Sequence, residues 1–326
     1  MKKDLLKNII IRIMFLVDIL LIPFIAISAV ILKLYRRAGS QRLSRNTWLL
    51  KKIGVFPIRD HYYEPLFNNE RLYKNLREKR LLPGIDFNAK NQLQLLKNLT
   101  FQEEFKNFIN IQDKLDNESA FQLPNRSFDA GDAEFLFNYV RYLKPSKVIE
   151  VGCGQSTKII SHALFLNQQE TGIVSQHRCI EPYEAPWLDI FDNIEVIRAK
   201  IETTDHSIFT ELETNDLLFM DSSHIIRPQG DIIKEYLEII PSLQSGVIVH
   251  SHDIFSPRDY LESWITDNVF FWNEQYILEA TLSNNRSYEI IAALNFLKHD
   301  HFNALQKVCP FLTKASEPGS FYFKKI

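Results

Sequence analysis

The sequence predicts an α/β fold with a doubly wound, largely parallel sheet, and three observations support this prediction. Short apolar runs rich in β-branched residues recur through the last two thirds of the chain, starting at residues 148–151. Segments long enough for a helix separate these runs, which is the rhythm of repeated βαβ units. The first run leads into a turn that contains Gly152 and Gly154, and glycines there let the backbone turn sharply from a strand into a helix.

Composition indicates a globular protein with one main domain. The chain has 326 residues, 45% of them hydrophobic, which is enough to bury a substantial core. Its net charge is only -2, and the body of the chain has no block of lysine or arginine, so we expect no nucleic-acid partner. Cys153, Cys179 and Cys309 are scattered and form no C-x-x-C pair, so we predict neither a disulfide framework nor a structural zinc site.

An apolar run of 20 residues, 13–32, lies near the N-terminus. As a helix it would be roughly 30 Å long, about the thickness of the hydrocarbon core of a bilayer. Asp18 and Pro23 interrupt the run. The favourable free energy of inserting its many large apolar side chains still exceeds the cost of inserting the one central carboxylate, Asp18. We therefore predict an N-terminal membrane anchor over residues 1–40.

Basic residues flank this run on both sides and are more numerous after it. The positive-inside rule then predicts that the rest of the chain faces the cytoplasm. Two alternatives remain open: Ala26 and Ser28 resemble a signal-peptide cleavage site, and Pro23 allows a bent, re-entrant insertion. The flanking residues are Lys2, Lys3, Lys7 and Arg12 before the run, and Lys33, Arg36, Arg37, Arg42, Arg45, Lys51 and Lys52 after it.

Residues 41–124 are expected to form a helical, partly irregular accessory region, with helical periodicity over residues 91–109. Residues 59–63 (RDHYY) could line a substrate cleft or act as a packed connector. Residues 125–326 are predicted to form the main domain, which opens with a helix over residues 133–143. The predicted strands cover residues 147–151, 178–181, 194–198, 216–220, 246–250, 288–297 and 320–325, with a helix over residues 302–312 before the last one.

The glycine turn and an acid after the second strand indicate a nucleotide-like cofactor. Glu181 ends the second strand beside the turn, where a carboxylate can accept hydrogen bonds from both ribose hydroxyls. This arrangement suits any adenosine cofactor. Ser156 occupies the position of the third glycine of the dinucleotide fingerprint, so a pyrophosphate such as that of NAD is disfavoured.

The pattern Glu150-x-Gly152-x-Gly154 resembles motif I of the class I S-adenosylmethionine (SAM) dependent methyltransferases. The resemblance implies a seven-stranded Rossmann-like sheet of order 3-2-1-4-5-7-6. It also implies that Glu150 helps to hold the amino acid end of SAM and that the residues of the turn, Gly152, Gly154 and Ser156, lie against the cofactor. The adenine would lie near Glu202, after the third strand, and Asp221, after the fourth strand, is also expected to contact the cofactor.

A second set of polar residues follows the fourth and fifth strands. In a doubly wound sheet these strands are neighbours, so the residues after their ends converge in the crevice where ligands bind. Carboxylates and imidazoles are costly to bury unpaired, which argues against a purely structural role for all of them. Residues 256–260 and Trp264 could form a lid over this crevice. The set comprises Asp221, His224, His250, His252 and Asp253.

The segments D-S-S-H (221–224) and V-H-S-H-D-I (249–254) look like a methyltransferase family, family 24-like, that is similar to metal-dependent sugar and catechol O-methyltransferases. The resemblance covers about residues 125–326, and Ser222 replaces its usual glycine. It implies that Asp221, His252 and Asp253 hold a divalent ion, Mg²⁺ or Mn²⁺, and that His224 is the base. A metal-free alternative keeps His224 as the base and lets Asp221 orient it. Imidazole suits Mg²⁺ poorly.

We therefore interpret the chain as a membrane-tethered SAM-dependent O-methyltransferase. Asp132 or Glu134, at the start of the first predicted helix of the domain, is expected to touch SAM. The acceptor is expected to be a small molecule, a glycolipid or a lipid-linked glycan of the cell envelope. Two alternatives are a SAM- and metal-dependent hydroxylase of the same fold and a catalytically silent SAM-binding scaffold on the membrane.

Overall fold

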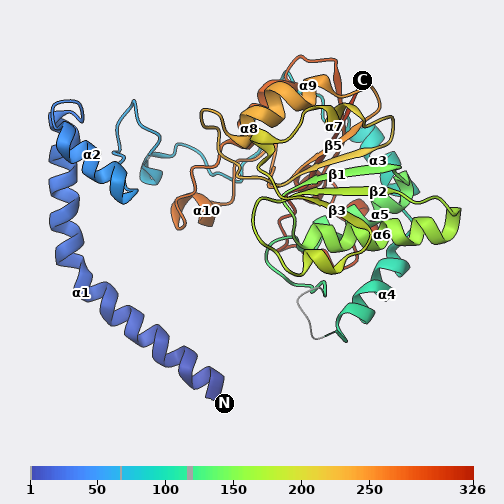
Figure 1. Ribbon diagram of the computed structural model, residues 1–326, viewed down its shortest axis with the longest axis horizontal. Coiled ribbons are helices and arrows are strands. Elements are labelled where there is room, and N and C mark those ends of the chain that lie inside the picture. Colours follow the sequence, from blue (N-terminus) through green and yellow to red (C-terminus); the bar gives the residue numbers. More distant parts are fainter. Residues whose placement is uncertain (1, 67, 116–119) are drawn as a thin grey trace. The chain divides into compact units, whose positions relative to one another are not determined.

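The computed structural model describes residues 2–66, 68–115 and 120–326, without the side chains of residues 2–5 and 8. Contacts between residues divide the chain into two compact units, Met1–Tyr73 and Lys74–Ile326 (Figure 1). The side chains of Lys2 and Lys3, two of the predicted flanking cations, lie outside the part of the chain that the structure describes.

The first unit is built around one long helix. Its elements are α1 (Lys2–Ala38), α2 (Ser44–Ile53) and the short 3₁₀ helix η1 (Asn69–Arg71). The predicted apolar helix is thus present, and an 18-residue stretch within its segment Ile9–Ala38 has a mean hydropathy of 2.7 with none of that stretch buried. Figure 1 shows that α1 is bent, and it contains Pro23, a usual cause of helix bending. Length and composition allow this helix to cross a membrane, although a signal sequence shares both properties.

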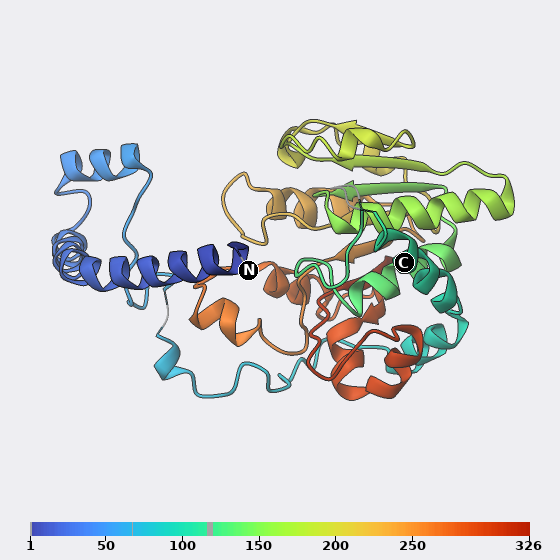
Figure 2. The ribbon, with the colours of Figure 1, turned by 90° about the horizontal axis from the view of Figure 1, so that it is seen from below.

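The second unit is a seven-stranded sheet flanked by helices (Figures 1 and 2). The strands are β1 (Lys147–Val151), β2 (Gln176–Ile180), β3 (Ile194–Ile197), β4 (Leu217–Met220), β5 (Ile248–Ser251), β6 (Tyr288–Ala293) and β7 (Phe321–Lys325). The longer helices are α3 (Ala89–Asn98), α4 (Gln102–Gln112), α5 (Asp132–Leu143), α6 (Gln155–Thr171), α11 (Glu274–Leu282), α12 (Leu294–Asp300) and α13 (Phe302–Val308). The shorter ones are η2 (Leu188–Ile190), η3 (Ile201–Thr203), α7 (Ser207–Thr210), α8 (Asp231–Lys234), η4 (Glu235–Ile239), α9 (Ile240–Ser242) and α10 (Glu262–Thr266).

The strand order is β3-β2-β1-β4-β5-β7-β6, which confirms the order that the resemblance implied. The first five strands are parallel, and β7 runs antiparallel between β5 and β6. Strand β4 is buried along its whole length, which explains why its sequence reads as a continuous apolar run, whereas the equally buried β5 carries His250 and Ser251.

Two predicted elements differ from the structure. The strand predicted over residues 288–297 ends at Ala293, and Leu294–Asp300 forms helix α12. Residues 294–297 are all buried, and a short apolar run fits a buried helix as well as a strand. The helical periodicity over residues 91–109 belongs to two helices, α3 and α4, which belong to the same compact unit as the sheet.

The sheet brings three chain segments together where its central strands end. The amide of Asp221 donates a hydrogen bond to the carbonyl of Val151 over 2.9 Å, just beyond β4 and β1. The amide of His252 donates to the carbonyl of Met220 over 3.0 Å, just beyond β5. Parallel strands therefore place the glycine turn, Asp221 and His252 side by side at one edge of the sheet.

Candidate cofactor and active site

A cavity of about 250 Å³ lies beside the glycine turn. Four of the residues predicted to bind the cofactor line it: Gly152, Glu181, Glu202 and Asp221. Each follows the end of a different parallel strand, β1, β2, β3 and β4, so the cavity lies in the crevice where such sheets bind ligands.

Gly152 has a specific reason to be glycine. Its φ is +79°, a conformation that L side chains rarely adopt. A Cβ atom at this position would lie 2.0 Å from the carbonyl oxygen of Asp221. The residue thus lets the end of β1 approach the end of β4 without a side chain between them.

Glu181 has its carboxylate fixed by the backbone around the cavity. It accepts hydrogen bonds from the amides of Cys153 (3.2 Å) and Tyr183 (2.9 Å). One bond ties Glu181 to the glycine turn and the other to the loop that follows β2. The carboxylate is oriented before any ligand binds, and each oxygen keeps lone-pair capacity for a ribose hydroxyl.

Three other residues predicted to bind the cofactor do not line this cavity. Glu150 is completely buried, accepts a hydrogen bond from the hydroxyl of Ser156 (2.6 Å) and lies 3.0 Å from Nε2 of His177. The amide of Gly154 donates to the hydroxyl of Thr157 over 3.0 Å. Glu150 and Ser156 thus bind each other beneath the turn, where they can shape it without facing the cavity.

A second, larger cavity of about 650 Å³ adjoins the end of β5. Asp132, His252 and Asp253 line it together with Phe255 and Trp264. Asp132 therefore lies at this cavity and not at the cofactor cavity, and its carboxylate accepts hydrogen bonds from the amides of residues 319 and 320. Glu134 lines neither cavity, because it is buried and bonded to the amides of Gly131 and Phe311.

His224 lies between one carboxylate from each cavity, although it lines neither cavity itself. Its Nε2 is 3.3 Å from Oδ1 of Asp221, which lines the cofactor cavity, and 3.5 Å from Oδ2 of Asp253, which lines the second cavity. The structure thus brings together the two predicted catalytic residues and adds Asp253 to them. We call these three residues the junction.

The charges at the junction are strongly coupled. Burial opposes ionisation of Asp221, but the positive charges of His252 and His224 outweigh it and lower the pKa of Asp221 to about 2. Burial also opposes protonation of His224, yet its hydrogen bonds to Asp221 and Glu274 raise its pKa well above the ordinary value. Burial raises the pKa of Asp253 to about 6, despite the attraction of the nearby histidines. At neutral pH, His224 therefore carries a proton among carboxylates.

The predicted metal ligands Asp221, His252 and Asp253 do not form a single group. Nε2 of His252 is 3.5 Å from Asp253 Oδ1 but also 3.3 Å from the carbonyl oxygen of Ser127. The donor atoms that lie within 4.8 Å of one another belong instead to Asp221, His224 and Asp253. Two carboxylates and one imidazole are a donor set that suits Mn²⁺ or Fe²⁺ better than Mg²⁺.

His250 remains in the core. Its ring stacks on Phe219 with centroids 4.0 Å apart, and neither ring nitrogen has a hydrogen-bond partner among the residues that the structure describes. Burial, together with the charge of His252, lowers the pKa of His250 well below the ordinary value. The rings of His250 and His252 lie 5.8 Å apart, but only His252 reaches a cavity.

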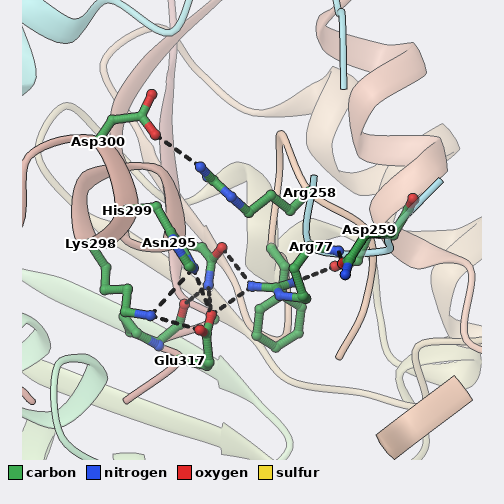
Figure 3. Close-up of polar contacts among 12 residues, drawn as sticks. Arg77, Arg258, Asp259, Asn295, Lys298, His299, Asp300 and Glu317 are labelled. Atoms are coloured by element: carbon green, nitrogen blue, oxygen red, sulfur yellow. Dashed lines mark hydrogen bonds and ion pairs between the residues drawn. The ribbon is translucent and has the colours of Figure 1, made fainter. Parts of the chain in front are cut away.

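The loop after Asp253 is held by an ion network, shown in Figure 3. Arg77 forms an ion pair with Glu317 (2.6 Å), donates to Oδ1 of Asn295 (3.0 Å) and donates to the carbonyl of Asp259. Its guanidinium also lies 5.4 Å from the ring centroid of Phe255. Since Phe255 and Glu317 line the second cavity, the segment that bears Arg77 helps to fix the cavity wall.

Several residues of the site carry no clear signal in the sequence. Glu274 binds His224 from a position fifty residues later in the chain, and it reads as an ordinary acid at a helix start. Tyr236 contacts Glu274 from η4 and reads as an apolar core residue. Arg227 and Asp231 line the cofactor cavity from the loop after β4 and the start of α8. Only the folded chain brings these residues to the crevice.

The chain shows limited similarity to known proteins. No family model matches it. An uncharacterised protein of Archaeoglobus fulgidus is 24% identical over 206 residues, which cover 58% of this chain and 88% of that protein.

Similar solved structures are methyltransferases. The plantazolicin methyltransferase BpumL, in complex with a triazolic desmethylPZN analog and SAH, is 12% identical with a TM-score of 0.35, covering 74% of this chain and 98% of that one. An O-methyltransferase from Bacillus cereus in complex with SAH is 11% identical with a TM-score of 0.36, covering 76% and 100%. A SAM-dependent methyltransferase from Archaeoglobus fulgidus is 15% identical with a TM-score of 0.32, covering 60% and 92%.

Proposed function

We propose that this chain is a SAM-dependent methyltransferase that methylates a hydroxyl group. The observation that carries the proposal is the junction, where His224 lies within 3.5 Å of one carboxylate from each cavity. A group transfer needs two ligands that meet at a point where a proton can be held. The strand order and the glycine turn support the choice of cofactor.

The residues of the first cavity fit an adenosine cofactor. Glu181 presents an oriented carboxylate for the ribose, and Glu202 lies at the strand end where the adenine is expected. When bound, SAM supplies a methyl group activated by a sulfonium sulfur. Asp221 provides a negative charge for that cation, and Gly152 leaves the backbone open beside it.

The residues of the junction would take the acceptor's proton. Asp253 lines the second cavity, and Nε2 of His224 is 3.5 Å from its Oδ2. A hydroxyl is a poor nucleophile until a base removes its proton, and since His224 is already protonated at neutral pH, the carboxylate of Asp253 is the group that would accept it. Asp221, at 3.3 Å on the other side, orients the His224 ring.

The second cavity is proposed as the acceptor site, and its charge limits the acceptor. Among the described residues, carboxylates outnumber cations along its wall, so an anionic acceptor would be repelled. Phe255 and Trp264 offer apolar surface to a ring or a chain. We therefore propose a neutral or cationic hydroxyl compound, such as a glycan or glycolipid. The charged lining residues are Asp113, Asp129, Asp132, Asp253, Glu317, Arg126 and His252.

We also propose that α1 anchors the protein in a membrane and that the sheet unit faces the cytoplasm, where SAM is made. An envelope hydroxyl, including that of a lipid-linked glycan, is then the acceptor that tethering would serve. Labelled SAM added to membrane extracts tests this, and we expect a labelled lipid-soluble product. Equal methylation of a soluble acceptor by a chain lacking residues 1–40 would argue against it.

Binding of SAM is the direct test of the cofactor. We expect calorimetry on the detergent-solubilised chain to show SAM binding and no NAD binding. Glu181→Ala should weaken SAM by about 10- to 100-fold, because it removes charge-assisted hydrogen bonds. Glu184→Ala is the matched control, since Glu184 is exposed and does not line the cavity. Equal affinity in the two variants would rule out the ribose role of Glu181.

A divalent ion at Asp221, His224 and Asp253 is the second candidate mechanism, favoured by the grouping of their donor atoms. Metal analysis of the purified chain distinguishes the two. In the metal case, manganese or iron would copurify and Asp253→Ala would lose it, whereas His252→Ala would keep it. Full activity after chelation would leave the metal-free mechanism.

A further inference from the structure

We propose that Glu274 is a positioning residue that holds the imidazole of His224 in the orientation the junction requires. The inference deepens the proposed function and rests on it for the reaction served. Nδ1–H of His224 donates a hydrogen bond to Oε2 of Glu274 over 2.8 Å. Because one ring nitrogen is engaged there, the other, Nε2, is the one directed at Asp221 and Asp253.

The carboxylate of Glu274 is itself fixed. The hydroxyl of Tyr236 donates to Oε1 of Glu274 over 2.9 Å and lies 2.9 Å from the hydroxyl of Ser251. All three side chains are buried, with Glu274 only 1% exposed. A buried carboxylate is costly unless its oxygens have partners, and here each oxygen has one. The ring of His224 is thus connected to strand β5 through a chain of hydrogen bonds.

The residues before Glu274 hold the rest of His224. The amides of Asn273 and Glu274 donate to the carbonyl oxygen of His224 over 2.9 and 3.2 Å. The ring of Trp272 packs against the imidazole with centroids 4.4 Å apart. His224 has a φ of +60°, which is uncommon for a residue with a side chain. Residues 272–274 therefore hold the ring, the ring nitrogen and the backbone of this one histidine.

A structural role and a positioning role predict different things. If Glu274 only stabilises the fold, its removal should lower stability and leave the His224 ring unchanged in variants that still fold. If it positions His224, a substitution that keeps the size but not the charge should weaken the Nδ1–H bond. Glu274→Gln and Glu274→Asp separate size from charge, because Gln keeps the length while Asp keeps the charge but is one carbon too short.

The experiment is proton–nitrogen-15 correlation NMR of the full-length protein in detergent, with its histidines labelled with nitrogen-15. The variant His224→Gln, which lacks the signal, serves to assign it. In the wild type we expect a strongly deshielded Nδ1–H proton. In Glu274→Gln and Glu274→Asp this signal should move to higher field or exchange too fast to be seen. Tyr236→Phe, which frees Oε1 of Glu274 without touching His224, should give a smaller shift in the same direction.

Methyl transfer gives the second readout, with membrane extract as the source of acceptor. Both Glu274 variants should lower kcat by about 10- to 100-fold, the effect found for carboxylates that orient metal-bound histidines, while the KM for SAM stays unchanged. Glu235→Gln is the matched control. Glu235 is completely buried and contacts Ser222 (3.2 Å), and burial and the neighbouring Glu274 raise its pKa well above the ordinary value, so Gln preserves its uncharged state.

An Nδ1–H signal identical in the wild type and Glu274→Gln would overturn the proposal, as would wild-type kcat in both Glu274 variants. The NMR result does not depend on turnover. Absence of SAM binding in the wild type would therefore defeat the proposed function while leaving the role of Glu274 answered.

Discussion

At the scale of single residues, the site depends on close contacts between strand ends. Gly152 lies against the carbonyl of Asp221, and His224 lies between Asp221 and Asp253. The contacts of Gly152 with Asp221 and of His224 with Asp253 join segments that are distant in the chain, whereas His224 and Asp221 are three residues apart. A change of one atom at such a point therefore alters how the strand ends fit together.

Gly152→Ala tests the closest of these contacts. We expect it to lower the free energy of unfolding by about 2–4 kcal/mol and to abolish SAM binding, because the new methyl would overlap the Asp221 carbonyl at a positive φ. Gly154→Ala is the matched control, since its Cβ would meet no atom within 4 Å and its φ of -165° is ordinary extended backbone. Thermal unfolding should leave Gly154→Ala near the wild type. Equal loss in both variants would contradict the steric reason.

Glu317 provides a prediction about pH. Burial raises its pKa, but hydrogen bonds from His299, Lys298 and Asn295 and the charge of Arg77 outweigh burial and hold the pKa of Glu317 well below its usual range. A lowered folded-state pKa adds stability that is present above the unfolded value, about 4.5, and is lost as the pH falls below it.

Glu317→Gln should therefore lower the free energy of unfolding by about 1–3 kcal/mol at pH 7. The difference from the wild type should shrink as the pH falls below about 4.5. Denaturant titrations at several pH values measure this. A difference that is constant with pH would show that the ionised carboxylate is not the source of the effect.

At the scale of elements, the wall of the second cavity is fixed by a segment from the start of the sheet unit. We call residues 74–82 the strap. The amide of Arg80 donates to the carbonyl of Pro257 (2.8 Å), and the amide of Asp259 donates to that of Leu76 (3.0 Å). The strap thus runs beside the loop that begins after Asp253. Figure 3 shows Arg77 bonded to Asp259 of that loop and also to Asn295 and Glu317.

Arg77→Met should lower the free energy of unfolding of the sheet unit by about 1–3 kcal/mol. It should also weaken binding of the acceptor more than binding of SAM. The reason is that Arg77 contacts Phe255 and Glu317, which line the second cavity only. Arg71→Met is the control, because Arg71 is exposed and its ion pair with Asp60 is 3.5 Å long. Equal effects on the two ligands would argue against a local action of the strap.

At the scale of the whole molecule, both cavities belong to the unit Lys74–Ile326, and the apolar helix belongs to the other. The proposed chemistry and the proposed attachment to a membrane would therefore belong to separate parts of the chain. This separation lets each part be tested without the other.

Removal of residues 1–40 should move the protein from the membrane fraction to the soluble fraction without changing its affinity for SAM. The physical reason is that the segment Ile9–Ala38 carries the apolar surface, whereas the cofactor cavity is lined by residues 151–231. Fractionation followed by calorimetry measures both. Full-length protein found mainly in the soluble fraction would contradict the anchor.

The sequence alone determined the α/β class, the strand order through a resemblance, the apolar helix and four of the residues that line the cofactor cavity, Gly152, Glu181, Glu202 and Asp221. It could do so because burial on both faces of a parallel strand and a glycine turn leave local patterns. Only the tertiary structure decided that Glu150 lies beneath the turn, that His224 rather than His252 joins Asp221 and Asp253, and that Glu274 holds His224. These outcomes depend on contacts between segments far apart in the chain, and no local pattern records which buried polar groups will meet.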